Sequence, residues 1–103
     1  MDRQAFEAML AADKFEPATT VERLPDTSLD LHSHPFEAKA MVITGELSIR
    51  TARDERVYRA GEIFHLFADV PHSETIGPAG VTYLVGGKQP MNQESLPSNP
   101  TLS

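Results

Sequence analysis

Short runs in which apolar and polar residues alternate fill most of the chain from residue 19 to residue 85. Leu47 and Ile49, for instance, alternate with polar neighbours, which is the two-residue period of a strand with one buried face. Turn-forming residues separate these runs at spacings of roughly 8–12 residues, as in β-sandwiches and barrels. The pattern predicts strands at 19–24, 29–34, 38–44, 47–51, 56–59, 63–67, 71–76 and 81–85. We therefore expect an all-β domain, because no central segment carries the helical period that a parallel α/β fold requires.

Glycine-containing segments mark the expected breaks between strands. Gly45 and Glu46 predict a turn between two of the runs, and residues 77–80, Gly-Pro-Ala-Gly, predict another. Both segments are therefore expected to end one strand and begin the next.

A helical pattern occurs near the N-terminus, where residues 2–15 predict a short helix. Asp2 suits the N-cap position, and Phe6, Met9 and Leu10 fall on one apolar stripe. Pro17 marks the end of this segment. Because so short a helix is marginal in water, we expect its stripe to pack against the rest of the domain.

The pattern divides the chain into three segments: an N-terminal helix at 1–17, a barrel at 18–87 and a proline-containing tail at 88–103.

Residues 38–43 are largely apolar on both faces of the predicted strand, so both faces must be covered by other parts of the protein. One face belongs to the barrel interior, and the other must meet the N-terminal helix or a second protomer. We expect a homodimer formed through strand exteriors.

Composition narrows the class of protein. The chain has 103 residues, enough for one domain, and a formal net charge of −6 with scattered basic residues. This charge argues against nucleic acid and anionic membranes as partners. The absence of cysteine excludes thiolate zinc sites and suits a reducing cytoplasm. No apolar run is long enough to span a membrane and no secretory signal is apparent, so we expect a cytoplasmic protein.

Two histidines separated by one residue are the strongest chemical signal. His32 and His34 lie in a strand-like run, where residues two apart share a face and can converge on one cation. His72, in the segment Asp-Val-Pro-His, is the natural third ligand. The alternative is a metal-free barrel in which these side chains line a pocket for an organic ligand.

These residues resemble the two signature motifs of the cupin superfamily. The segments that carry the resemblance are His32-Ser33-His34, Gly45-Glu46-Leu47, Gly61-Glu62 and Pro71-His72. The resemblance implies a single double-stranded β-helix, a jelly-roll-like antiparallel barrel with a divalent metal in its mouth. It also implies that His32, His34 and His72 are the metal ligands. Three imidazoles with open positions suit Zn, Ni, Cu, Fe or Mn, and the sequence does not choose among them.

The chain departs from the family motifs at several positions. The carboxylate ligand of the first motif would fall at Ala38, so Glu37 is one residue out of place and reaches the site only if a bulge re-aims it. Glu74 shares the parity of His72 and is the other candidate. Asp69 stands where the family usually has glycine, and aspartate tolerates the left-handed conformation of such a turn. His65 alternates with apolar neighbours and is expected to face outward.

The resemblance implies a metal-centred reaction without naming it. The superfamily includes dioxygenases, isomerases and decarboxylases, so we expect a metal-dependent enzyme of the oxidoreductase, isomerase or lyase type that acts on a small molecule. The alternative is a non-catalytic barrel that binds or senses a small ligand. The residues expected to face inward are apolar, namely Ala38, Ala40, Val42, Phe64 and Leu66. Such a pocket would take a compact, partly hydrophobic molecule.

Overall fold

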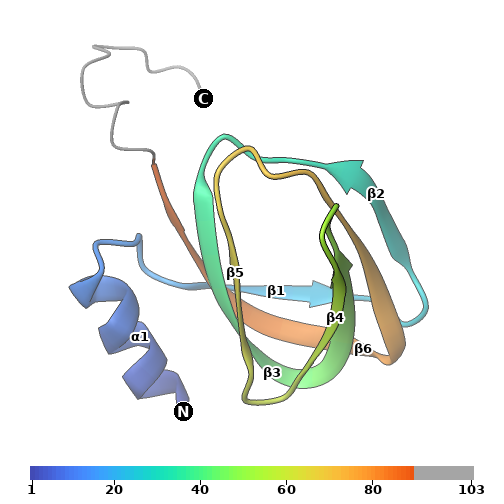
Figure 1. Ribbon diagram of the computed structural model, residues 1–103. Coiled ribbons are helices and arrows are strands. Elements are labelled where there is room, and N and C mark those ends of the chain that lie inside the picture. The colour runs from blue at the N-terminus through green and yellow to red at the C-terminus, as the bar shows by residue number, and fades with distance from the viewer. Residues whose placement is uncertain (90–103) are drawn as a thin grey trace.

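The chain folds into an antiparallel β-barrel with one short helix on its outside (Figure 1). This computed structural model describes residues 1–89, so that most of the expected tail at 88–103 lies outside the described residues. The elements are α1 (Arg3–Ala12), β1 (Thr19–Arg23), β2 (Ser28–His32), β3 (Glu37–Arg50), β4 (Glu55–Arg59), β5 (Ile63–Leu66) and β6 (His72–Lys88). The prediction of an all-β domain with an N-terminal helix is confirmed.

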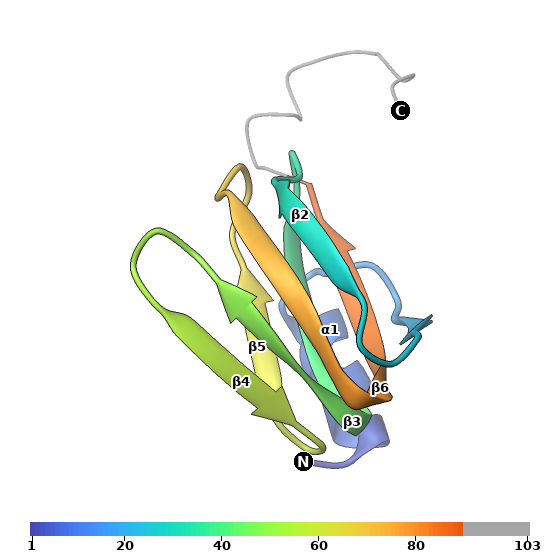
Figure 2. The same ribbon diagram turned by 90° about the vertical axis from the view of Figure 1, so that its right-hand side faces the viewer.

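Two long, bent strands form the framework of the barrel. β3 and β6 pair with each other along most of their length. Each of them also pairs with two short strands, one along its first half and one along its second. β3 pairs with β5 through its first half and with β4 through its second. β6 pairs with β2 through its first half and with β1 through its second. Figure 2 shows β4 and β5 on one side of the molecule and β2 on the other.

The predicted breaks at 45–46 and 77–80 are wrong, because β3 and β6 continue through both segments. The register passes from Leu47 opposite Ile76 to Gly45 opposite Val81, so residues 77–80 form a bulge opposite a single residue of β3. Gly45 has a φ of 77°, and a Cβ atom there would lie 2.0 Å from the carbonyl oxygen of Gly80. The glycines therefore allow two paired strands to bend where their backbones approach closely, and do not end them.

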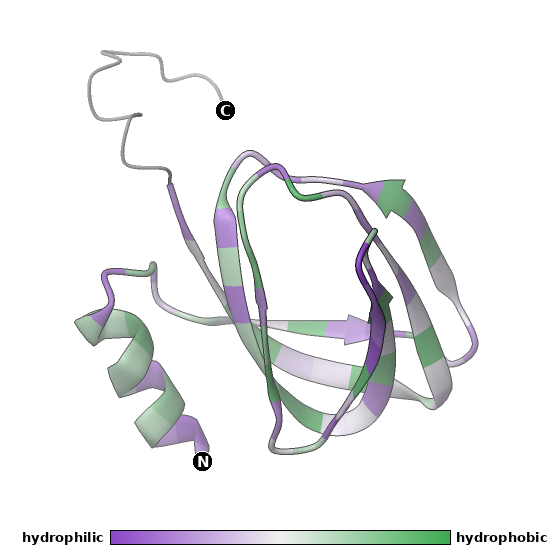
Figure 3. Ribbon diagram, in the orientation of Figure 1, coloured by the Kyte–Doolittle hydropathy of each residue, from purple (hydrophilic) through white to green (hydrophobic). Residues whose placement is uncertain are grey.

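The barrel interior is filled by the residues that alternation places inward, and Figure 3 shows apolar and polar residues alternating along the strands. All five residues of the predicted inward set are buried: Ala38, Ala40, Val42, Phe64 and Leu66. Other members of this cluster, such as Ile76 and Tyr83, come from β6.

Helix α1 covers the outside of the barrel. Asp2 caps it as predicted, by accepting a hydrogen bond from the Ala5 amide at 2.8 Å. Phe6 and Leu10 are buried against Met41 and Leu84, which point outward from β3 and β6. The second apolar face of residues 38–43 is thus covered by the helix of the same chain. The homodimer stays a prediction, to be tested by the molar mass in solution.

The helix ends at Ala12, earlier than the predicted residue 15. Lys14 has a φ of 68°, so the backbone leaves the helix before Pro17. Among residues 1–89, no helix is long and apolar enough to cross a bilayer.

Candidate metal centre

The three histidines meet at one end of the barrel, where β2 ends and β6 begins. His32 is the last residue of β2 and lies opposite His72, the first residue of β6. His34 lies on the connection between β2 and β3, and its carbonyl oxygen accepts a hydrogen bond from the Asp69 amide at 2.7 Å. Asp69 has a φ of 63°, which confirms that aspartate adopts the left-handed turn expected there. Residues 40 positions apart in the sequence are thereby fixed side by side.

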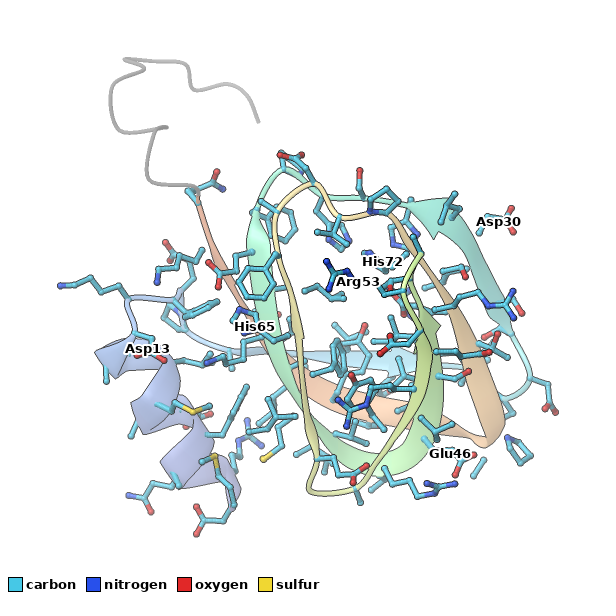
Figure 4. The ribbon with its side chains drawn as sticks, viewed as in Figure 1. Asp13, Asp30, Glu46, Arg53, His65 and His72 are labelled. Carbon is cyan, nitrogen blue, oxygen red and sulfur yellow. The ribbon has the colours of Figure 1, made fainter. Side chains whose placement is uncertain are left out.

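The distances suit a shared cation. One ring nitrogen from each of His32, His34 and His72 lies within 4.8 Å of the other two. Two bonds of about 2.1 Å span at most ~4.2 Å, so small side-chain rotations bring all three nitrogens within bonding range. His72 is buried, whereas the other two are half-buried. Figure 4 shows His72 inside the barrel and His65 on the side that faces the helix.

Backbone carbonyl groups orient two of the rings. The Nδ1 atom of His32 lies 2.6 Å from the carbonyl oxygen of Asp30, and that of His72 lies 3.0 Å from the carbonyl oxygen of Val70. A carbonyl oxygen only accepts, so each Nδ1 carries a hydrogen, and in the neutral ring Nε2 presents a lone pair. This is how metal-binding histidines are usually held.

Glu74 adds a buried carboxylate beside two of the three histidines. Its Oε2 atom lies 3.5 Å from Nε2 of His72 and 3.8 Å from Nε2 of His32. Among the described residues, the buried side-chain atoms without a hydrogen-bond partner are Nε2 of His72 and Oε1 of Glu74. With a neutral His72 ring, the Nε2 lone pair faces the Glu74 carboxylate in a buried site, an arrangement that a cation stabilises.

Glu37, the other candidate carboxylate, lies elsewhere. Its Oε2 atom is 2.5 Å from Nε2 of His65, and His65 stacks on Phe67 and meets Phe15 edge to face. His65 therefore faces outward, as predicted. No bulge re-aims Glu37, which points away from the three histidines as a regular strand requires.

The environment keeps His34 in its neutral form. Burial lowers the pKa of His34 below its ordinary value, and the charges that His72 and His32 carry when protonated lower it further. A lowered pKa favours the unprotonated imidazole, which is the form that binds metals.

A cavity of about 200 Å³ opens beside the histidines. Its walls are mainly apolar, as expected, but Arg23 and Tyr83 also line it, and the sequence analysis did not identify either residue. Alternation along the strands contains the missing signal, since Arg23 shares the parity of Val21 and Tyr83 shares that of Val85. The expectation of an apolar pocket is therefore incomplete, because these two polar side chains also line it.

Comparison with known proteins supports the fold. No protein-family model matches the chain, and no curated protein matches it. Solved structures do match it. One is an RmlC-like cupin from Shewanella frigidimarina, 17% identical, covering 74% of this chain and 68% of that one with a TM-score of 0.60. Another is KdgF from Halomonas, 14% identical, covering 75% and 72% with a TM-score of 0.60.

A third match is a variant of oxalate decarboxylase from Bacillus subtilis. It is 17% identical, with a TM-score of 0.63, over 70% of this chain but 20% of that one. At such identities the likeness establishes the fold alone. The protein has the cupin fold.

Proposed function

We propose that this cupin-fold protein binds one divalent metal ion through His32, His34 and His72, and that it is a metal-dependent enzyme acting on a small molecule. We also propose that Glu74, and not Glu37, is the carboxylate of the centre. The observation that carries the proposal is the convergence of three imidazole nitrogens within 4.8 Å of one another, beside a buried carboxylate. Among the described residues, Nε2 of His72 and Oε1 of Glu74 are buried without a hydrogen-bond partner. An organic ligand alone would have to donate hydrogen bonds to several acceptors at once, whereas one cation satisfies them together.

The donor set limits the metal and the class of reaction. Imidazole nitrogens with one carboxylate suit zinc, nickel, iron, manganese or copper. A bound ion of this kind supplies Lewis acidity, or activates water or dioxygen, at its open coordination positions. The cavity beside the histidines gives a small substrate access to the same point. A reaction of the dioxygenase, isomerase or lyase type fits this arrangement.

The test is elemental analysis of protein purified without a histidine tag, on the native chain and on single alanine variants. We expect about one equivalent of a first-row metal in the native protein, and its loss in His34→Ala and His72→Ala. His65→Ala is the matched control, because His65 faces the helix and should leave the metal content unchanged. The identity of the ion then narrows the reaction, iron towards oxygenation and zinc or nickel towards isomerisation or lyase chemistry.

A native chain that takes up no metal, even when reloaded without oxygen, would refute the proposal. The protein would then be a metal-free barrel for an organic ligand.

A further inference from the structure

We propose that the cavity beside the histidines binds a small organic acid, whose carboxylate is held by Arg23 and Tyr83 while its apolar body lies against the barrel wall. The inference rests on the proposed function, since the same cavity gives access to the metal centre. It goes further by naming the chemical class of the substrate and the residues that select it.

Arg23 places a cation on the wall of a mainly apolar cavity, which Glu74 and two of the histidines also line. It is the last residue of β1, and it shares a face with Val21, which packs against the barrel core. Within residues 1–89, no carboxylate lies within 4.0 Å of its guanidinium group, whereas Arg3, Arg50 and Arg59 each pair with a glutamate. An arginine at a cavity and without an acidic partner is available to an anionic ligand.

Tyr83 supplies a second donor beside Arg23. The ring is buried in the barrel core, in edge-to-face contact with Phe64 at 5.3 Å, and it lines the same cavity. Burial raises the pKa of Tyr83, as does the charge of Glu74, while the charge and hydrogen bonding of Arg23 oppose the shift. The phenol therefore keeps its proton at neutral pH and can donate to a ligand.

The other walls define the rest of the ligand. The cavity is also lined by Phe36, Phe64, Leu66 and Val85, which offer no hydrogen-bonding side chains. At about 200 Å³ it is smaller than the roughly 300–1,000 Å³ of pockets that hold drug-sized molecules. The fit is a short acid with a branched or flat apolar body.

Because the protein has a net charge of −6, binding of an anion requires a local positive charge, which Arg23 supplies. A protein of this charge repels anions at long range, so that an acid binds only where a local cation overcomes the repulsion. Losing a charged hydrogen-bond partner should then cost about tenfold or more in affinity.

The test is calorimetric titration with isovalerate and with its uncharged amide, on metal-free and on zinc-loaded protein. We expect the native protein to bind the acid about tenfold or more tightly than the amide. Arg23→Gln should abolish this preference, Arg23→Lys should keep part of it, and Tyr83→Phe should weaken binding of the acid. Arg53→Gln is the control, because Arg53 is exposed between β3 and β4 and does not line the cavity.

Metal content measured on the same samples separates this inference from the proposed function. Equal affinities for acid and amide, no binding of either, or an unchanged preference in Arg23→Gln would overturn the inference even where the metal binds. A preference that depends on Arg23, in a protein that takes up no metal, would support the anion site and refute the metal centre.

Discussion

Replacing Glu74 with glutamine should stabilise the metal-free protein and weaken metal binding at the same time. In the native chain a buried carboxylate oxygen lies 3.5 Å from the Nε2 atom of His72. In the neutral ring this Nε2 atom presents a lone pair, because Nδ1 carries the hydrogen and donates it to the Val70 carbonyl oxygen. The glutamine amide can instead donate to Nε2, so one unsatisfied acceptor gains a partner and one buried charge is removed.

The structure sets the size of both effects. A new hydrogen bond contributes about 0.5–1.5 kcal/mol, so the free energy of unfolding of the metal-free protein should rise by about 1 kcal/mol. For a domain of this size, that raises the melting temperature by about 4–8 °C. Metal affinity should fall by about 10–100-fold, as it does when a partner of a metal site is lost.

Glu37→Gln is the matched control, since Glu37 pairs with His65 on the outside of the barrel. It should leave metal affinity unchanged and should not stabilise the protein. Urea unfolding in the presence of a chelator gives the first quantity, and competition with a chromophoric chelator gives the second. A Glu74→Gln protein that is less stable without metal, yet binds metal as tightly as the native chain, would refute the reasoning and make Glu74 a structural residue.

Two further predictions concern Tyr83 and the helix. Burial and the charge of Glu74 raise the pKa of Tyr83 above its ordinary 10.0, so the unfolded chain loses this proton first and stability declines as the pH rises above about 10. Tyr58→Phe leaves Tyr83 as the one tyrosine, and its ultraviolet titration should have a midpoint above 10; a midpoint at or below 10 would contradict the assigned environment. Phe6→Ala should cost about 3 kcal/mol, because Phe6 is fully buried between α1 and the barrel. Urea unfolding measures this loss, with the exposed Gln4→Ala as control, and an unchanged midpoint would show that α1 does not stabilise the barrel.

Local pattern was enough to predict most of the fold. Alternation places residues such as Ala40 and Phe64 inside the barrel, because strand side chains point to opposite faces in turn. It could not show that Gly45 and Gly80 bend strands instead of ending them. That outcome depends on the close approach of the backbones at Gly45 and Gly80, which are 35 positions apart in the sequence and meet only in the assembled barrel.

In the candidate site, too, some features follow from local sequence and others from the tertiary structure. The sequence by itself predicted that His32 and His34 converge, because residues two apart in a strand share a face, and motif resemblance supplied His72. β2 ends at His32, so His34 reaches the site from the connection to β3. Only the tertiary structure placed Glu74 beside His32 of β2 and Glu37 beside His65 of β5, since each of these pairs joins residues from different strands. The cavity likewise exists only after β1 and β6 pair, because that pairing brings Arg23 and Tyr83 to one wall from separate parts of the chain.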